Sequence, residues 1–325
     1  MLPEPTQFPQ FTWRPITPAD AYAMHQTAVA DMTADGADSA QTVEELQPLL
    51  DFLQNELPHD SLAAFTADGT LAAMALLFLP PAAEGSELRF NASGTVHHAH
   101  RGQRLGTFIL SWIEARARQK ADGRAALIQT NCRDHNQDRI DLFTQQGFEP
   151  TRYFYRMQRD LHQPVPDAPL TDGLRLRPWQ PELDNATRLA FNDSFQDHFG
   201  FFPVNEEIWR VGFSGKPEFR GDLTRLALDD ADNVIGFCLC SVSAGRNEQT
   251  GWNEGILEDI GVIRGWRKKG IASALIVAAL HGFKEAGLDK AALGVDTENP
   301  TGALRLYENL GFYAMRRSVT FTKTL

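Results

Sequence analysis

Cysteine is scarce in this sequence, and the scarcity narrows the kinds of protein that the chain can form. The 325 residues include three cysteines, Cys132, Cys238 and Cys240. Three thiols cannot build a disulfide framework, so we expect a reduced, cytoplasmic protein. Cys238 and Cys240 lack a second pair that would complete a zinc site, and we interpret them as buried apolar residues.

Positive charge is also in short supply. The chain has 31 Lys and Arg residues against 42 Asp and Glu residues, which gives a formal net charge of −11. Nucleic acids and anionic membranes are bound by basic surfaces, so we expect neither as a partner. No apolar run approaches the ~20 residues of a membrane span, and the amino terminus lacks the basic region and apolar core of a secretory signal.

The most informative stretch, residues 257–272, is expected to fold as a strand, a loop and a helix. The apolar strand ends at Val262, a basic loop follows, and helical spacing of apolar residues begins at Ile271. The first turn of a helix has unpaired backbone N–H groups and the positive end of the helix dipole. Because Gly270 would let a phosphate approach the backbone, this loop predicts a pyrophosphate-binding site.

The same order of elements occurs twice in the chain. A first loop begins at Arg101 and its segment ends at Phe148, and a second loop begins at Arg267 and its segment ends at Phe312, at nearly the same spacing. We therefore interpret the chain as a tandem duplication. The expected parts are an N-terminal domain at 1–161, a proline-rich linker at 162–171 and a C-terminal domain at 172–325.

Apolar periodicity and turn residues predict the remaining elements. In the first half we expect strands at 11–16, 61–66, 71–79 and 125–129, and helices at 19–29, 43–56, 106–121 and before 148. In the second half we expect strands at 174–179, 223–228, 234–242, 257–262 and 291–295, and helices from 183, at 206–212, from 271 and after 299.

Two motifs in the second half resemble signatures of the GNAT N-acetyltransferase superfamily. The acyl-CoA signature is Arg or Gln, two residues, Gly, one residue, then Gly or Ala, and residues 267–272 fill every slot. An Asn followed by Ala-Leu, a Tyr and a terminal Leu-Gly-Phe is the second signature, which residues 299–312 match. The resemblance implies an α/β fold (α+β mixed sheet) with two tandem GNAT-like acyl-CoA N-acyltransferase domains. This layout is similar to that of mycothiol synthases, although Ile256 stands where those carry a glutamate.

The resemblance also implies the reaction and its co-substrate. The C-terminal domain would move an acetyl group from acetyl-CoA to an amine acceptor by direct transfer, without a covalent acyl-enzyme and without a metal. The residues that the resemblance assigns to cofactor binding are Ile260, Gly261, Val262, Arg267, Lys268, Lys269, Gly270, Ile271, Ala272, Ser273, Asn299 and Ala303.

Acyl transfer needs a base, because alkyl amines are protonated below about pH 10. Glu258 and Asp259 are adjacent on the expected strand, so they face opposite sides of the sheet. Glu258 lies an even number of residues from Val262 and therefore faces the same side of the sheet. A β-bulge would direct Asp259 into the cleft instead. Glu254 is a third candidate, and each carboxylate is alternatively a solvated group at the end of a sheet.

For the acid, the resemblance implies that the Tyr307 hydroxyl protonates the leaving sulfur. The alternative is a tyrosine that only packs against the sheet. Asn299 would cap the following helix, with Pro300 at its first position, and by resemblance its amide also holds the pantetheine.

The acceptor is expected to be a small-molecule amine whose pocket includes His198, Phe199 and Trp209, with core packing as the alternative interpretation. A small amine, an antibiotic, a thiol precursor and a protein amino terminus all remain open. The cluster of His97, His98 and His100 favours a solvated loop over a metal site. We expect a monomer or a homodimer.

The two halves are not equivalent. Arg104 stands where the signature has its first glycine, and no tyrosine in the stretch 141–144 matches Tyr307. We therefore expect the N-terminal domain to be degenerate, with a structural or regulatory role. For the whole chain, the alternative function is a non-catalytic acyl-CoA-binding regulatory protein.

Overall fold

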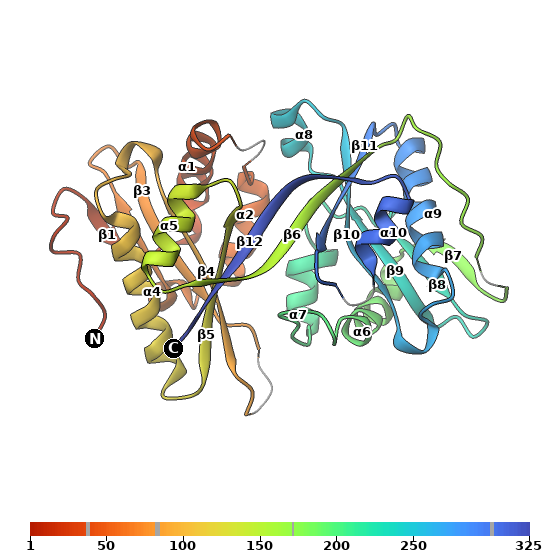
Figure 1. Cartoon of the computed structure of the whole chain (residues 1–325), viewed down its shortest axis with the longest axis horizontal. Helices are drawn as coiled ribbons and strands as arrows, with labels where there is room; N and C mark the ends of the chain where they lie inside the picture. The colour runs from red at the N-terminus through yellow and green to blue at the C-terminus, as the bar shows by residue number, and fades with distance from the viewer. Residues whose placement is uncertain (37–39, 82–84, 171, 300–301) are drawn as a thin grey trace. The chain divides into compact units, whose positions relative to one another are not determined.

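The computed structural model describes residues 1–36, 40–81, 85–170, 172–299 and 302–325, and it divides into two compact units (Figure 1). The first unit comprises Met1–Arg152 together with Ser318–Leu325, and the second comprises Tyr153–Arg317. The sequence placed the division in the linker at 162–171. The units instead change at Arg152 and at Arg317, because two long strands end in a different unit from the one in which they begin.

These strands are β6 (Glu149–Asp160) and β12 (Tyr313–Thr324). The end of β12 pairs with β5 of the first unit, from Ser318 opposite Arg133 to Thr324 opposite Leu127. β6 pairs with β11 of the second unit over residues 154–160. Each unit therefore completes its sheet with the last strand of the other half of the chain.

The first unit has a mixed sheet in the order β1-β2-β3-β4-β5-β12. Its neighbouring strands are antiparallel, except for the parallel pair β4 and β5. Its elements before β6 are β1 (Thr12–Arg14), α1 (Ala21–Ala34), α2 (Val43–Phe52), α3 (Leu57–Asp60), β2 (Ser61–Phe65), β3 (Leu71–Phe78), β4 (Leu88–Val96), α4 (Leu105–Ala121), β5 (Ala126–Arg133) and α5 (Gln137–Gln145).

The second unit repeats this plan, with the order β6-β11-β10-β9-β8-β7 and β10 and β11 as its parallel pair. Its elements are β7 (Arg175–Pro178), α6 (Asp184–Ser194), α7 (Glu206–Trp209), β8 (Arg225–Leu228), β9 (Val234–Ser241), α8 (Ala244–Thr250), β10 (Glu254–Val262), α9 (Ile271–Glu285), β11 (Lys290–Asp296) and α10 (Ala303–Asn309). This repetition confirms the α/β fold with a mixed sheet that the resemblance implied.

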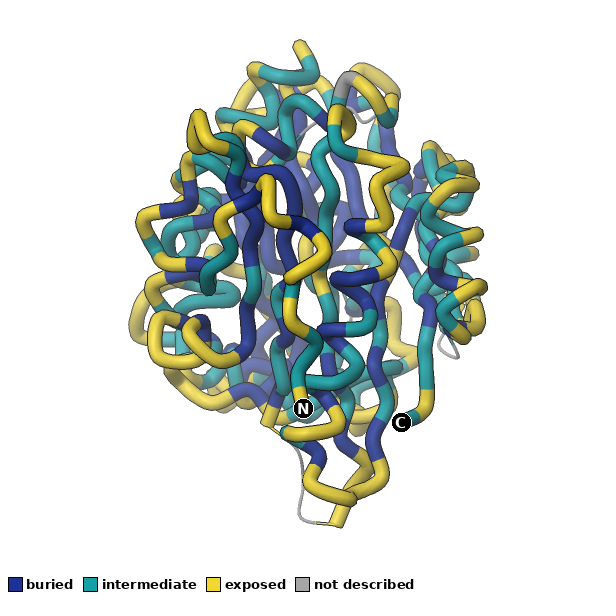
Figure 2. Tube along the Cα trace, turned by 90° about the vertical axis from the view of Figure 1, so that its left-hand side faces the viewer, coloured by how far each residue is buried: buried dark blue, intermediate teal, exposed yellow. Residues whose placement is uncertain are grey.

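The apolar run at residues 234–240 is explained by the position of β9 in the sheet. Every residue of β9 is buried, because helices cover both faces of the sheet at this strand. Cys238 and Cys240 belong to the core that contains α9, whereas Phe237 and Leu239 pack in the cluster that contains Phe191 of α6. Figure 2 marks the burial of each residue along the trace, where buried stretches alternate with exposed turns and loops.

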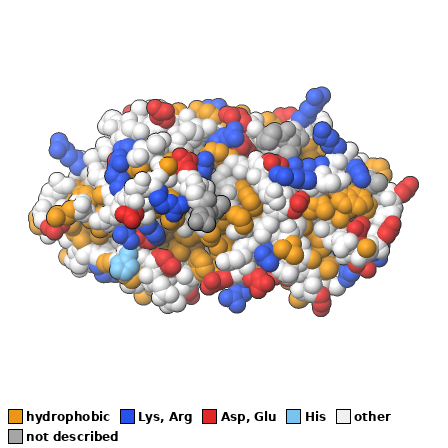
Figure 3. Space-filling view, turned by 90° about the horizontal axis from the view of Figure 1, so that it is seen from below, with side chains coloured by type: hydrophobic (Ala, Val, Ile, Leu, Met, Phe, Trp, Pro, Cys, Tyr) orange, Lys and Arg blue, Asp and Glu red, His pale blue; other side chains and the backbone are white. Residues whose placement is uncertain are grey.

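Charged side chains of both signs lie on the surface. On the face shown in Figure 3, Lys and Arg side chains are interspersed with Asp and Glu side chains. Among the described residues, none of the helices combines the length and the apolar character that crossing a membrane requires.

Candidate active site

The candidate site of the second unit lies where two parallel strands separate. β10 pairs with β11 from Glu254 to Leu257 and with β9 as far as Val262. Beyond Leu257, therefore, β10 continues beside β9 while the described part of β11 no longer pairs with it. The part of β10 that holds Ile260, Gly261 and Val262 thus has an edge where an extended ligand can add like a further strand.

A β-bulge marks the same point. The register of β9 and β10 shifts between Leu257 and Asp259, so Glu258 is the additional residue. A bulge places two consecutive side chains against one residue of the neighbouring strand. Glu258 and Asp259 consequently do not follow the simple alternation of a regular strand, and both line one cavity, described below.

The basic loop after β10 adopts a conformation that leaves the N-terminus of α9 accessible. A short helical turn, Arg264–Trp266, follows the strand, and Lys268 and Gly270 both have positive φ, at 62° and 75°. Gly270 is the N-cap of the 15-residue helix α9. Lys268, Lys269 and Gly270 are exposed, whereas Ile271 is buried in the core and fixes the first turn of the helix.

Arg267 anchors this loop rather than extending from it. Its guanidinium donates to the carbonyl oxygens of Val262 at 3.2 Å and Ser194 at 2.7 Å, and it forms an ion pair with Asp197. The Arg264 backbone N–H donates to Asp193 Oδ1 at 3.0 Å. The loop is therefore tied to the end of β10 and to α6, which positions the α9 N-terminus.

These residues fit the diphosphate of an acyl-CoA. A Cβ built on Gly270 meets nothing within 4 Å, so the backbone borders open space on the side where an anion would lie. Unpaired N–H groups in the first turn of α9, the helix dipole and the exposed ammonium groups of Lys268 and Lys269 all favour negative charge there. Ala272 and Ser273 follow in the same turn and are half-buried.

A cavity of about 220 Å³ opens beside the bulge. Its wall combines apolar and charged side chains from β9, β10 and the segment after α7. The lining residues are Gly212, Phe213, Lys216, Phe219, Leu239, Ser241, Glu258 and Asp259.

The two carboxylates of this cavity have different environments. Burial, together with the negative charge of Glu258, raises the pKa of Asp259 to about 7, although the ammonium of Lys216 acts in the opposite direction. Glu258 is exposed and accepts a hydrogen bond from the Ser241 hydroxyl at 2.5 Å. Asp259 therefore exchanges protons near neutral pH, as a general base must.

Tyr307 lies on α10 and is buried. Burial, with smaller contributions from Cys238 and Asp259, raises the pKa of its hydroxyl. The hydroxyl is consequently protonated at physiological pH and can act as a proton donor.

The N-terminus of α10 differs from the expectation. Gly302, at φ 75°, is the N-cap, and Ala303 begins the helix. Asn299 precedes the helix in a turn, where its carbonyl oxygen accepts from the Gly302 N–H at 3.2 Å. The prediction that Asn299 caps the helix is thus wrong, because the helix begins later than the motif suggested. Pro300 lies outside the described residues.

None of the three predicted acceptor residues is among those that line this cavity. Trp209 is buried, stacks on Phe213 with ring centroids 4.6 Å apart and donates from Nε1 to Asp184 at 2.8 Å. His198 is half-buried, and burial together with the Arg267 charge lowers its pKa, opposed by Asp296 and Asp197. Phe199 follows it and is also half-buried. Trp209 therefore supports Phe213, which lines the cavity.

Glu254, the third candidate base, is buried in an ion pair with Arg156 and accepts from Gln158 Nε2 at 2.7 Å. Both partners belong to β6, so this carboxylate holds that strand in the second unit. Among the described residues, no group of three or more His, Cys, Asp or Glu side chains is arranged to hold a metal ion.

The first unit contains a corresponding loop with nearly the same anchoring. Arg101 donates from Nε to Val96 O at 3.2 Å and pairs with Asp35, and the His98 N–H donates to Asp31 at 2.7 Å. Gly102 and Arg104 have positive φ, at 76° and 64°. Arg104 thus adopts, at the N-cap of α4, the left-handed conformation that Gly270 adopts at the N-cap of α9.

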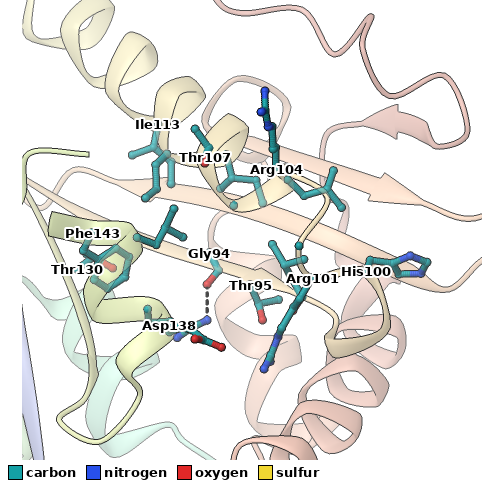
Figure 4. A pocket seen from close by; sticks show the side chains of 18 of the residues that line it. Gly94, Thr95, His100, Arg101, Arg104, Thr107, Ile113, Thr130, Asp138 and Phe143 are labelled. Atoms are coloured by element: carbon teal, nitrogen blue, oxygen red, sulfur yellow. Dashed lines mark hydrogen bonds between the residues drawn. The ribbon is translucent and has the colours of Figure 1, made fainter. Parts of the chain in front are cut away.

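This loop borders a cavity of about 490 Å³ (Figure 4). Ile113, Phe143 and Thr130 form part of its wall, and Arg101 and Arg104 extend from the loop in different directions. Arg139 also lines it and donates from Nη2 to the Gly94 carbonyl oxygen at 2.9 Å. In this unit the Arg139 guanidinium is therefore hydrogen-bonded to the carbonyl oxygen of Gly94, which stands at the position equivalent to Ile260.

The groups that could perform proton transfer are not repeated in the first unit. Counted back from the valine that ends each strand, Ala92 and Ser93 stand where the second unit has Glu258 and Asp259. Phe143 stands where it has Tyr307, counted back from each Gly-Phe pair. β3 and β4 pair in unbroken register from Asn91 to Val96, without the bulge of β10.

Sequence reasoning missed six residues of the cavity: Gly212, Phe213, Lys216, Phe219, Leu239 and Ser241. The first four come from an irregular segment, which includes a turn of π-helix at Arg210–Ser214 and an isolated bridge between Phe219 and Ser241. No periodic pattern predicts such a segment. The available signal was its position between α7 and β8, where aromatic residues accumulate.

Comparison with known proteins gives consistent results. The model of the acetyltransferase (GNAT) family matches residues 23–148 and again residues 184–312. A mycothiol acetyltransferase of Salinispora tropica is 30% identical over 291 residues, which cover 86% of each chain. A mycothiol acetyltransferase of Salinispora arenicola is 29% identical and covers 90% of each chain.

Solved structures show the same architecture. A GCN5-related N-acetyltransferase from Sphaerobacter thermophilus superimposes with a TM-score of 0.72 at 27% identity, covering 100% of this chain and 97% of that one. A tandem GNAT protein from the clavulanic acid biosynthesis pathway has a TM-score of 0.65 at 16% identity and covers 97% and 98%. At that identity the second likeness concerns the fold alone.

Proposed function

The chain belongs to the acetyltransferase (GNAT) family, and from this premise we propose that its second unit transfers an acetyl group from acetyl-CoA to the amine of a small molecule. The family establishes an acyl-CoA-dependent N-acyltransferase and does not favour the alternative of a protein that only senses acyl-CoA. The choice of acetyl as the acyl group, the assignment to the second unit and the residue roles are the proposal.

One observation carries the assignment. Asp259, at the bulge of β10, lines the cavity, and the buried Tyr307 lies on α10 of the same unit. The second unit therefore contains both a candidate base and a candidate acid. In the first unit, Ser93 and Phe143 stand at these two positions.

Different residues of the second unit would bind different parts of the acyl-CoA. The α9 N-terminus with Gly270, Lys268 and Lys269 would hold the diphosphate, and the open edge of β10 at Ile260 and Val262 would align the pantetheine amides. When bound, acyl-CoA supplies an activated thioester carbonyl. These residues therefore orient that group over the bulge.

Proton transfer is assigned to two side chains. Asp259, with a pKa of about 7, accepts a proton from the acceptor's ammonium group, because only the neutral amine is nucleophilic. Tyr307 donates its hydroxyl proton to the departing sulfur, and burial keeps that hydroxyl protonated until it is needed. Glu258, exposed at the cavity and hydrogen-bonded to Ser241, attracts the cationic acceptor.

The relatives named mycothiol acetyltransferase make a thiol-containing amine one acceptor that should be tested. Ile256 is buried in β10 opposite Ser241, so this chain has an apolar side chain at the position where mycothiol synthases carry a glutamate. The carboxylates of this site are instead Glu258 and Asp259, which lie two and three residues further along β10, at the bulge.

The test is thiol release from acetyl-CoA, propionyl-CoA and butyryl-CoA with a panel of primary amines and with a thiol-containing amine. We expect the highest kcat/KM with acetyl-CoA and amine-dependent turnover that Asp259→Asn abolishes. Turnover that is independent of any amine, or unchanged in Asp259→Asn, would contradict the proposal.

A further inference from the structure

The cavity beside the bulge contains both signs of charge. Asp259 and Glu258 provide negative charge on one element, β10, and Lys216 provides an ammonium from the irregular segment after α7. Lys216 and Asp259 line the same cavity, and the ammonium charge of Lys216 lowers the pKa of that carboxyl group. The carboxylates alone are sufficient to bind the ammonium group of an acceptor. The cation of Lys216 in the same wall therefore suggests that the acceptor has a second, negatively charged group.

Lys216 is placed to meet a ligand. Its side chain is 38% exposed, so it can exchange its water for a ligand group without the cost of burying a bare charge. The ion pair that the structure gives it, with Glu218, has an N–O distance of 3.9 Å, which is the long end of the range for such pairs. A carboxylate bound directly to the ammonium would form a shorter, charge-assisted hydrogen bond.

The remaining wall is apolar and confined. Phe213, Phe219 and Leu239 supply the apolar surface, and a Cβ built on Gly212 meets nothing within 4 Å, so the cavity extends up to that backbone. The volume of about 220 Å³ is below the ~300–1,000 Å³ of pockets that enclose drug-sized molecules. The enclosed part of the acceptor is therefore small.

We infer that the acceptor is a free amino acid with an apolar side chain, whose amino group faces Asp259 and Glu258, whose carboxylate faces Lys216 and whose side chain lies between Phe213 and Phe219. This inference rests on the proposed function, because it concerns the acceptor of the same site. It makes Lys216 the residue that distinguishes an amino acid from a simple amine or an aminoacyl amide.

The reaction balances without a further reactant. The amine nitrogen loses one proton to Asp259 as it binds and forms a bond to the acyl carbon, and the bond from that carbon to sulfur breaks. A second proton leaves the nitrogen for solvent, and the sulfur takes the Tyr307 proton. The proton held by Asp259 then returns through solvent to the Tyr307 oxygen, which restores both groups. The products are an N-acylamino acid, the free thiol and one released proton.

The experiment compares three acceptors in the wild type and in matched variants. The acceptors are L-leucine and L-leucinamide, which differ in the carboxylate, with isoamylamine as the simple amine. The proteins are the wild type, Lys216→Met, Lys216→Arg and the control Lys284→Met, an exposed lysine on α9 outside this cavity. The readouts are kcat/KM with acetyl-CoA and the Kd of each acceptor measured by calorimetry in the presence of CoA.

We expect Lys216→Met to lower kcat/KM for L-leucine by about 10- to 100-fold, and to weaken L-leucine binding similarly, because a charge-assisted contact is lost. The change for L-leucinamide should be under about threefold, Lys216→Arg should retain most of the preference, and Lys284→Met should behave as the wild type. The comparison between the two substrates cancels the different basicity of their amines.

An equal loss for both substrates would show a structural role for Lys216 and overturn the inference, as would no loss for either. If L-leucinamide or isoamylamine releases thiol and L-leucine does not, the amino-acid inference fails and the proposed function stands. If none of the amines, including the wider panel used for the proposed function, releases thiol, the proposed function itself fails.

Discussion

Asp259 and Glu258 illustrate how adjacent residues of one type acquire different chemistry. Asp259 lines the cavity from β10 and holds a proton up to about pH 7, whereas Glu258 is exposed and accepts a hydrogen bond from Ser241. Burial disfavours the charged form of a carboxyl group, and a neighbouring like charge adds to that effect. The bulge thus makes one carboxylate a base and leaves the other as a source of negative potential.

Replacement of these residues should separate the two roles. Asp259→Asn keeps the shape and removes the base, so kcat should fall by about 10²–10⁴-fold. Glu258→Gln, the matched control, should lower kcat/KM by less than about tenfold. The measurement is thiol release with a saturating primary amine, and a larger loss in Glu258→Gln than in Asp259→Asn would reverse the assignment.

The pH dependence of the rate should report Asp259 directly. A base with a pKa of about 7 is protonated and inactive below that value, so log kcat/KM should rise with pH and change slope near pH 7. In Asp259→Asn the break near pH 7 should disappear from the residual activity. A break that persists unchanged in this variant would show that another group titrates.

The same carboxyl group should make the folded state pH-sensitive. Its pKa is raised on folding, from 3.8 to about 7, so the folded protein retains a proton that the unfolded chain releases. Its contribution to stability is greatest at low pH and is lost as the pH rises through this interval. We therefore expect Asp259→Asn to have a higher melting temperature than the wild type at pH 8, with a smaller difference at pH 4.5, in calorimetric scans. A variant less stable at pH 8 would contradict this.

At the scale of elements, the two helix-preceding loops show how much backbone conformation the sequence reveals. Each loop has positive φ at its second and fourth positions, occupied by Lys268 and Gly270 in one unit and by Gly102 and Arg104 in the other. Glycine adopts the left-handed conformation more readily than any other residue. Each unit in fact places glycine at only one of the two positions, so the sequence of one loop does not predict the other.

Gly270 allows a direct test of this conformation. Gly270→Ala places a Cβ at φ 75° and should cost about 1–2 kcal/mol, although space for the methyl group is available. Gly265→Ala is the matched control, because it lies in the same loop, has no such φ and also has open space. Urea denaturation should show a loss for Gly270→Ala and none for Gly265→Ala. Equal effects would contradict the backbone explanation.

Local patterns predicted most of the elements, but not the strands β4, β6 and β12, and only part of the site. The spacing around Gly270 and Tyr307 led to the correct family, and the bulge at Glu258 was one of two alternatives that the parity argument left open. The cavity residues Lys216 and Phe219 were missed, because an irregular segment brings them to β10 and nothing in their own sequence encodes that contact. The prediction that Asn299 caps the helix was also wrong, because Gly302, three residues later, is the N-cap.

At the scale of the whole molecule, the exchange of β6 and β12 could not be predicted. Both strands follow a helix at the end of a repeat. Pairing between strands far apart in the chain depends on tertiary contacts rather than on local propensity. The domain limits at 161 and 172 followed the proline-rich linker, whereas the compact units change at Arg152 and Arg317.

This exchange predicts that a substitution near the C-terminus destabilises the first unit. Phe321 on β12 is buried and packs against Phe143 of that unit, with ring centroids 5.3 Å apart. Phe321→Ala should cost about 3–5 kcal/mol. Hydrogen exchange should then lose protection in β3 to β5, while β9 to β11 keep theirs. Loss of protection confined to the second unit would contradict the strand assignment.

The central claim is that acyl transfer takes place in the second unit, and the most direct test compares the two loops by the same substitution. Kinetics with acetyl-CoA and a reactive amine should be measured for the wild type, Gly270→Glu and Arg104→Glu, with calorimetry of acetyl-CoA binding. Gly270→Glu should lower kcat/KM by at least about 100-fold, because it places a carboxylate where the diphosphate binds, and Arg104→Glu should stay within about twofold of the wild type. Full activity in Gly270→Glu together with loss in Arg104→Glu would place the chemistry in the first unit and contradict the account.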